Sequence, residues 1–359
     1  MFLFIITSIL WIRNRRHGLE GYLKLESMDE KQEFFEQYTW KLVYADVFRT
    51  PPYPMCLSVV CGTGIQIFLG ILSSLIYLCF VSGNQTKNGS TLMIILFFCM
   101  IMGIASGYVS ANLYKTFKGT ELKKNALLTA LGLPAALFAT FTLIQGHAIS
   151  IGSSLAVSID TQLLLLLICL TVEVPLVLIG YYFGQKHRGI KFPVNIRSLP
   201  NPSLDQSSYS CFKVSGCLCG LLPFSMIYIF MYFIMLQVWS EMNVMMMNNI
   251  LVPFILFTIG SGLTSIISSF MMFQLQYYKW WWNAFSQGVS VAILVFLHAV
   301  GFSNKLHFPM ILTYGFYFSC MGLLSLIIGV MVGAISIMSS LWFNLKLFDS
   351  LNHQPVSNE

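Results

Sequence analysis

The sequence of 359 residues is 56% hydrophobic and only 9% charged, with a mean hydropathy of +0.73. Soluble domains carry about 25% charged residues, so this composition excludes a water-soluble fold of this size, because too few polar side chains remain to cover its surface. The formal net charge of +6 comes from loops between apolar stretches and gives no indication of nucleic-acid binding.

The first apolar stretch, residues 2–12, is too short to cross a bilayer, because a membrane helix needs about 20 residues. It also lacks the features of a secretory signal peptide, since no basic residue precedes it and no small-residue cleavage site follows it. We interpret residues 1–12 as the end of a first transmembrane helix whose beginning is missing. Residues 13–55 are then predicted to form a cytosolic loop.

Eight longer apolar stretches follow, and each can cross the bilayer as a helix. The predicted spans are 56–82, 91–114, 125–146, 161–184, 215–239, 250–276, 284–303 and 311–343. We therefore expect an all-α polytopic membrane helix bundle with eight full spans plus a partial first span. Residues 56–345 are predicted to form the eight-helix transmembrane bundle, and residues 346–359 a cytosolic tail.

The basic residues predict how the chain is oriented. When the spans alternate in direction, all of the 20 lysines and arginines except Lys87 and Lys305 fall on one side of the membrane. Basic loops remain on the cytosolic side, so we predict that the C-terminus is cytosolic. The loop 83–90 is then lumenal.

Two N-x-Ser/Thr triplets lie in the predicted lumenal loop, beginning at Asn84 and Asn88. Both asparagines are candidate N-glycosylation sites. The alternative is a chance match, because this triplet is common and the loop is short.

The segment WKLVYADVFRTPPYP, residues 40–54, precedes the first full span. Proline fixes φ, has no backbone N–H and pushes the preceding residue towards an extended conformation. The three prolines therefore predict a stiff, extended lead-in rather than a helix. Within it Asp46 and Arg49 are close enough to pair.

Glu173 lies inside the predicted span 161–184, followed by Pro175. A charged carboxyl group at that depth costs at least about 2.5 kcal/mol and marks a candidate functional site. A helix kinked at Pro175 would place Glu173 in a site that binds an ion or relays protons. The alternative, which we prefer, is a protonated or hydrogen-bonded structural glutamate.

Small residues recur at a spacing of four in several spans, which brings helix backbones close together. The glycine pairs are Gly103 with Gly107, Gly216 with Gly220, and Gly329 with Gly333. Trp280, Trp281 and Trp282, next to Lys279, are predicted to form an aromatic belt at the cytosolic interface.

The sequence contains no nucleophile elbow, phosphate-binding loop, H-E-x-x-H zinc motif or dinucleotide fingerprint. We therefore expect no enzymatic activity and no cofactor. Four methionines between residues 242 and 247 offer soft ligands for Cu(I). In a chain with 19 methionines, we prefer the interpretation that they fill apolar gaps.

Four blocks, in chain order, resemble motifs of the nonaspanins, the transmembrane 9 superfamily. The first block consists of Trp40, Lys41, Leu42 and Val43, followed by a D-V-F-R-x-P-P pattern at residues 46–52. The second comprises residues 183–184, 193–194 and 196–197, the third residues 219–224 and the fourth residues 278–282. The motif residues that we single out are Asp46, Val47, Phe48, Arg49, Pro51, Pro52, Cys219, Gly220, Pro223, Phe224, Trp280, Trp281 and Trp282. The chain departs from the pattern at residues 44–45, where His-Gly is usual, and at Thr50, which is inserted or substituted.

The resemblance implies nine helices, a lumenal N-terminus and a cytosolic C-terminus, as the charge distribution also predicts. Nonaspanins carry a large lumenal domain before the first helix and a lysine-containing tail that holds them in the Golgi. We expect this sequence to depart from that pattern, because no such domain precedes residues 1–12 and the final segment, FDSLNHQPVSNE, contains no lysine. We therefore expect Met1 to be an internal or mis-assigned start, or the gene to have lost its 5′ part.

The resemblance also implies a function in Golgi and endosomal membranes. It implies the sorting of client proteins that have glycine-rich membrane helices, with effects on adhesion and phagocytosis. The partners expected here are the lipid bilayer, such clients, and coat or sorting factors. The alternative is a transporter or channel for a small solute or ion, centred on Glu173.

Overall fold

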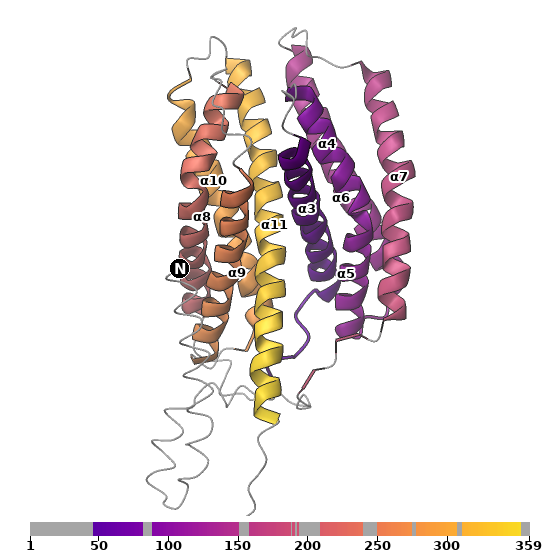
Figure 1. The fold of residues 1–359 in the computed structure, drawn as a ribbon, viewed down its shortest axis with the longest axis vertical. Helices are drawn as coiled ribbons and strands as arrows, with labels where there is room; N and C mark the ends of the chain where they lie inside the picture. Colours follow the sequence, from indigo (N-terminus) through magenta and orange to yellow (C-terminus); the bar gives the residue numbers. More distant parts are fainter. Residues whose placement is uncertain are drawn as a thin grey trace, which may run out of the picture.

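The structure is a computed structural model that describes residues 46–81, 88–150, 158–187, 189–190, 192–193, 209–239, 250–274, 278–306 and 311–352. Within these ranges all regular secondary structure is helical, and the helices stand side by side in an elongated bundle (Figure 1). The predicted partial first span, residues 1–12, and most of the predicted loop 13–55 lie outside the described residues.

Eight helical segments of the described chain are long and apolar enough to cross a membrane. In chain order the helices are α3 (Pro54–Val81), α4 (Asn88–Ile101), α5 (Gly103–Thr116), α6 (Leu122–Ser150), α7 (Ile159–Lys186), α8 (Tyr209–Trp239), α9 (Leu251–Gln274), α10 (Trp280–Ser303) and α11 (Ile311–Asn352). Because α4 and α5 together form one span, the prediction of eight full spans and an all-α bundle is confirmed.

The span made by α4 and α5 is interrupted at Met102, which has φ −71° and ψ 0°. Backbone hydrogen bonds continue on both sides of the interruption, from the Met102 amide to the Phe98 carbonyl and from the Ser106 amide to the Met102 carbonyl. Glycine follows at position 103, and glycine weakens a helix by about 0.5–1 kcal/mol relative to alanine. The interruption therefore adjoins a residue of low helix propensity.

Three other spans stay helical through an internal proline, at Pro134, Pro175 and Pro223. α7 stays helical through Pro175, and the interruption near Glu173 lies in the neighbouring span, at Met102. α11 is 42 residues long and continues to Asn352, past residue 345, where we placed the end of the transmembrane bundle. At about 1.5 Å per residue, α11 is roughly twice as long as the hydrocarbon core is thick.

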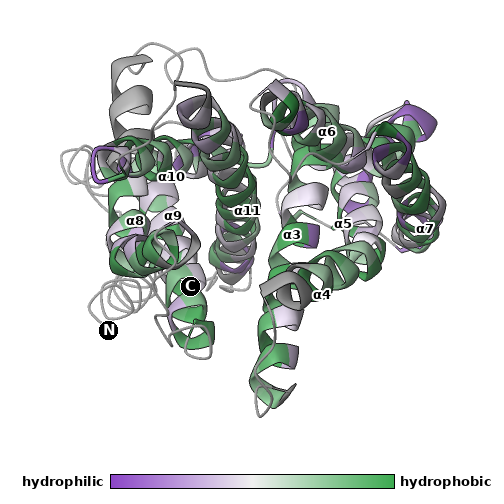
Figure 2. Ribbon diagram, turned by 90° about the horizontal axis from the view of Figure 1, so that it is seen from above, coloured by the Kyte–Doolittle hydropathy of each residue, from purple (hydrophilic) through white to green (hydrophobic). Residues whose placement is uncertain are grey.

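The helices form two groups that meet along α11. Seen from above (Figure 2), α8, α9 and α10 lie on one side and α3 to α7 on the other, with α11 between them. α11 contacts α9 and α10 in the first group and α3 and α6 in the second. The last span therefore joins the two halves of the bundle.

Glycines allow backbone contact between spans in both groups. A Cβ atom on Gly107 of α5 would overlap the carbonyl oxygen of Val177 in α7, and one on Gly288 of α10 would overlap that of Gly329 in α11. No side chain fits at such positions, and the close approach lets dispersion forces act between helices in lipid, where the hydrophobic effect does not.

Five of the predicted glycines pack against the protein's own helices, in agreement with the helix-packing interpretation. They are Gly103, Gly107, Gly220, Gly329 and Gly333. Gly216 lies in α8, at a position whose side-chain surroundings are outside the described residues.

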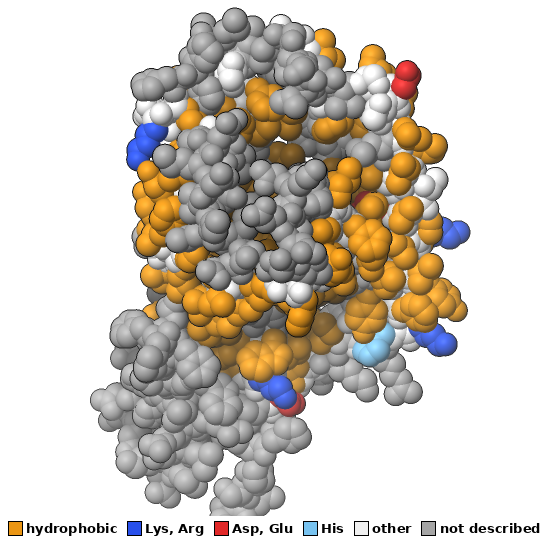
Figure 3. Space-filling view, turned by 45° about the horizontal axis from the view of Figure 1, so that its top comes forward, with side chains coloured by type: hydrophobic (Ala, Val, Ile, Leu, Met, Phe, Trp, Pro, Cys, Tyr) orange, Lys and Arg blue, Asp and Glu red, His pale blue; other side chains and the backbone are white. Residues whose placement is uncertain are grey.

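The outer surface is apolar over most of its described area. On the face in Figure 3, hydrophobic side chains predominate, and lysine, arginine and acidic side chains are few. On α7 the leucines at positions 163, 164 and 167 are each more than half exposed. A contiguous apolar surface of this extent is typical of a protein that is solvated by lipid.

Candidate functional site

The segment before α3, residues 46–53, forms a folded connection at the end of the bundle. It begins with a turn in which the Arg49 amide donates to the Asp46 carbonyl at 3.1 Å. The predicted pair of side chains also forms, because Arg49 Nη2 lies 2.8 Å and Arg49 Nε 3.3 Å from Asp46 Oδ1. The Asp46 side chain is buried and that of Arg49 is partly exposed, so the pair closes the turn at the edge of the bundle.

Three consecutive indole groups in the first turn of α10 bind this connection. Each Nε1–H donates to a backbone carbonyl oxygen of a segment that forms no helix or strand. The pairs are Trp280 with Val47 at 2.9 Å, Trp281 with Arg49 at 3.1 Å, and Trp282 with Pro52 at 2.7 Å. We call residues 46–53 and 280–282 together the tryptophan junction.

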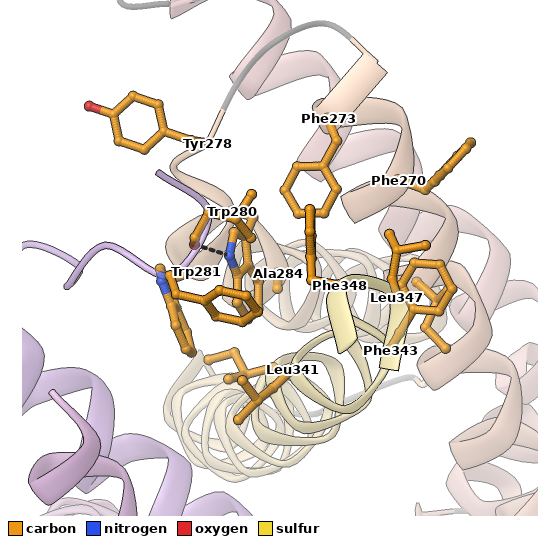
Figure 4. Packing of buried hydrophobic residues seen from close by; sticks show 14 of the residues in the cluster. Phe270, Phe273, Tyr278, Trp280, Trp281, Ala284, Leu341, Phe343, Leu347 and Phe348 are labelled. Atoms are coloured by element: carbon orange, nitrogen blue, oxygen red, sulfur yellow. Dashed lines mark hydrogen bonds between the residues drawn. The ribbon is translucent and has the colours of Figure 1, made fainter. Parts of the chain in front are cut away.

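The tryptophan junction is also the centre of an aromatic cluster. The rings of Trp280 and Trp281 are stacked with centroids 4.0 Å apart, and Trp281 meets Phe117 edge to face at 5.0 Å. Figure 4 shows Trp280 directed towards the connection, with a hydrogen bond to it, and surrounded by phenylalanine and leucine side chains of α9 and α11. Phe48 extends the cluster by stacking on Phe192 at 4.7 Å.

The predicted interfacial belt is therefore wrong for two of the three tryptophans. Trp280 is 0% exposed and Trp281 is 2% exposed, so both are part of the protein core and cannot anchor the chain in the lipid headgroups. The structure brings together two of the four motif blocks, whose contacting residues are about 230 positions apart in sequence. Nothing local in either block indicates the other as its partner.

The block around Cys219 has a different position. Gly220 of α8 packs against the side chain of Ser290 in α10, and Phe224 meets His298 of α10 edge to face at 6.3 Å. Pro223 is buried inside the helix. This block therefore packs α8 against α10, on the side of α11 where α9 also lies.

Glu173 lies inside the bundle, where α7 meets α3, α4 and α5. It is 4% exposed, and its Oε1 accepts a hydrogen bond of 2.8 Å from Gln66 Nε2 of α3. The same nitrogen donates to the Cys99 carbonyl in the last turn of α4 at 3.1 Å. A Cβ on Gly103 would lie 3.7 Å from both Gln66 Nε2 and Glu173 Cγ, so the pair sits beside the interruption at Met102.

Sequence reasoning singled out Glu173 and missed its partner. Gln66 is 1% exposed in the middle of α3. A lone glutamine in an apolar span is a signal of the same kind as a lone glutamate, because an amide also needs hydrogen bonds when it is buried.

A second buried polar cluster was not predicted either, and it joins four helices. Asn125 of α6 is its centre. Asn125 accepts from Ser58 of α3 at 2.9 Å and donates to Ser110 of α5 at 3.1 Å and to Tyr181 of α7 at 3.2 Å. Tyr181 in turn donates to the Leu122 carbonyl at 2.9 Å. One side-chain network thus holds α3, α5, α6 and α7 together at the end near the tryptophan junction.

The Asn125→Ala variant is expected to lose about 1–3 kcal/mol of unfolding free energy. The substitution removes three inter-helix hydrogen bonds at a site that is 0% exposed, and such interactions average about 0.6 kcal/mol each in a membrane bundle. Thermal unfolding of the detergent-purified protein measures the effect. Thr142→Ala, at a hydroxyl that bonds its own helix at Ala139, is the control and should change little.

A third polar seam runs between α9, α10 and α11. Gln287 of α10 donates to the Ser261 carbonyl at 3.0 Å and to Thr264 Oγ1 at 2.7 Å, and Ser265 shares a hydrogen bond of 2.6 Å with Ser340 of α11. These groups stabilise one half of the bundle as the Asn125 cluster stabilises the other.

The remaining predicted sites are less informative. Asn84 and the methionines between residues 242 and 247 lie outside the described residues, and Asn88 is the first residue of α4. Within the described ranges, no three histidine, cysteine, aspartate or glutamate side chains are grouped so that they would hold a metal ion.

Comparison with known proteins agrees with the motif blocks. Residues 1–311 match the family model of endomembrane protein 70. The chain is 31% identical over 352 residues to Transmembrane 9 superfamily member 10 of Arabidopsis thaliana, and the alignment covers 98% of this chain and 55% of that protein. It is 30% identical over 348 residues to Transmembrane 9 superfamily member 4 of Homo sapiens, with 97% of this chain and 54% of that protein covered.

A third relative, Transmembrane 9 superfamily member 2 of Homo sapiens, is 29% identical over 349 residues, with 97% of this chain and 52% of that protein covered. The chain thus spans about half the length of these relatives. No solved structure matches it. The family match and the alignments along nearly all of this chain show that it belongs to the endomembrane protein 70 family, the transmembrane 9 superfamily that its motifs indicated.

Proposed function

We propose that this membrane protein assists the sorting, trafficking and membrane localisation of other transmembrane proteins in Golgi and endosomal compartments, with consequences for adhesion and phagocytosis. The observation that carries the proposal is the relation to transmembrane 9 superfamily proteins along 97–98% of the chain. In this proposal the clients are transmembrane proteins with glycine-rich helices, and coat or sorting factors bind the cytosolic loops.

The contact surface for clients must be sought on faces that the bundle leaves open. The glycines of the predicted pairs that the structure describes pack against neighbouring spans, so they cannot also receive a client helix. α6 offers an alternative, because its Gly132 and Ala136 are both exposed and lie four residues apart. Close helix contact through small residues supports association in lipid, so we propose this face of α6 as the client surface.

Substitution of Gly132 and Ala136 by leucine tests this proposal. The double variant Gly132→Leu/Ala136→Leu should lower the surface level of a client with a glycine-rich helix about two- to tenfold, because larger side chains remove close contacts worth about 1 kcal/mol. Quantitative surface labelling of the client, in cells whose own copy is deleted, measures the effect. Total abundance of the variant is measured in parallel.

Gly301→Leu is the matched control. Gly301 is also exposed, and a Cβ atom added to it would have no neighbour within 4 Å, but it lies on α10. Client levels that fall equally in both variants would count against the α6 surface. Client levels that do not change when the whole gene is deleted would count against the sorting function itself.

A further inference from the structure

We propose that Glu173 and Gln66 form a buried site that binds one monovalent cation, a proton or an alkali metal ion, inside the membrane bundle. The inference goes beyond protein sorting and requires no transport. It starts from charge balance. The two ion pairs that form between described residues are Arg49 with Asp46 and Lys124 with Glu121, so no basic side chain of that part of the chain lies within 4.0 Å of Glu173.

An unpaired carboxylate is not stable at this position. The Glu173 side chain is 4% exposed, and a buried charge without a partner costs several kcal/mol in protein interiors. One hydrogen bond from a neutral amide does not offset that cost. Since no basic side chain among the described residues neutralises the carboxyl group, a cation taken up by the protein would do so.

The second observation is an unsatisfied oxygen on the neighbouring side chain. Gln66 Nε2 lies between two acceptors, Glu173 Oε1 at 2.8 Å and the Cys99 carbonyl at 3.1 Å. The Cys99 carbonyl can only accept a hydrogen bond, so this contact fixes which amide atom is nitrogen. Gln66 Oε1 is then a buried acceptor with no hydrogen-bond partner. A proton on Glu173, or a metal ion beside it, would supply what this oxygen lacks.

The surroundings restrict the class of ligand. Carboxylate and amide oxygens are hard ligands, which favour a proton or an alkali or alkaline-earth ion over soft metals. A single carboxylate balances one positive charge and not two. Of the titratable side chains in the described ranges, the thiols of Cys99 in α4 and Cys169 in α7 lie close enough to interact with Glu173. From α3 and α5 it meets Gln66 and Gly103, which are uncharged, and α6 carries its lysines at positions 123 and 124, in its first turn.

The test measures the thermal unfolding temperature of the purified full chain. One arm of the experiment varies the alkali ion and the other varies the pH. In the first arm NaCl or KCl replaces choline chloride at constant ionic strength and pH. In the second arm the pH is varied between about 5 and 8 in choline chloride alone. A ligand that binds only the folded protein raises Tm. We expect a rise of about 2–5 °C in one arm: with added Na⁺ or K⁺ for an alkali ion, or with falling pH for a proton.

The variants identify the residues responsible. Glu173→Gln should remove the dependence in the responding arm, whereas Asp160→Asn, at an exposed acid in the first turn of α7, should retain it. Gln66→Met keeps the size of the side chain but removes both amide atoms, Oε1 and Nε2. It should change the apparent affinity in the responding arm about tenfold. It also provides a test if Glu173→Gln does not fold. A wild-type protein whose Tm responds in neither arm, or a response that Glu173→Gln and Gln66→Met both leave unchanged, would overturn the proposal.

Discussion

Trp280→Ala is expected to lower the free energy of unfolding by about 3–5 kcal/mol, as for other fully buried aromatic residues. The side chain is 0% exposed, and its loss opens a cavity between α9, α10 and α11. It also leaves the Val47 carbonyl without its donor, which adds about 1 kcal/mol or more. Thermal unfolding in detergent, followed by near-ultraviolet circular dichroism, measures the change.

Two further variants separate packing from hydrogen bonding. Trp280→Phe keeps most of the apolar volume and removes the donor, so its loss should be clearly smaller than that of Trp280→Ala. Trp342→Ala is the control for removing an indole, because Trp342 is 62% exposed, and it should change stability by less than about 0.5 kcal/mol. Equal stability losses in Trp280→Ala and Trp342→Ala would show that the tryptophan junction contributes little.

Gly107→Ala is expected to separate α5 from α7 and to lower the unfolding free energy by about 3 kcal/mol or more. The added methyl group would overlap the Val177 carbonyl oxygen and crowd the Tyr181 amide. Both obstacles are backbone atoms of a continuous helix, so no side-chain rotation can relieve the overlap. The helices must move apart, and the close contacts around positions 104 and 180 are lost with them.

Gly146→Ala is the matched control in α6, where no atom lies within 4 Å of the new methyl group. Because alanine favours a helix by up to about 1 kcal/mol over glycine, this variant should be as stable as the parent or slightly more so. The comparison uses the same thermal-unfolding measurement. A Gly107→Ala protein as stable as Gly146→Ala would mean that α5 and α7 are not in backbone contact.

The sequence was sufficient to predict the spans, because their length and apolar composition follow directly from the thickness of the bilayer. The helix predicted at 161–184 and observed as Ile159–Lys186 shows how closely such a boundary can be placed. The pair of Asp46 and Arg49 was also predictable, since its members are three residues apart. These features depend on local composition or local spacing.

The partners across the bundle could not be predicted in the same way. Trp280 looks like an interfacial anchor in sequence, because nothing near it indicates that residues 46–53 will cover it. Proline drew attention to position 175, whereas the helix is interrupted at Met102, next to Gly103 and to the Cys99 carbonyl that accepts from Gln66. Such outcomes depend on which helices become neighbours, and apolar spans carry little information about that.

The tryptophan junction also has a consequence for the order in which the protein is made. Its first hydrogen bond joins residues 233 positions apart, so the connection before α3 leaves the ribosome long before the indoles that will cover it. Until α10 is inserted, the Val47 carbonyl lacks the indole donor that it has in the folded protein. The ribosome must therefore complete seven of the eight described spans before this end of the protein can close, and the nascent chain depends on chaperones or on the translocon for protection in the interval.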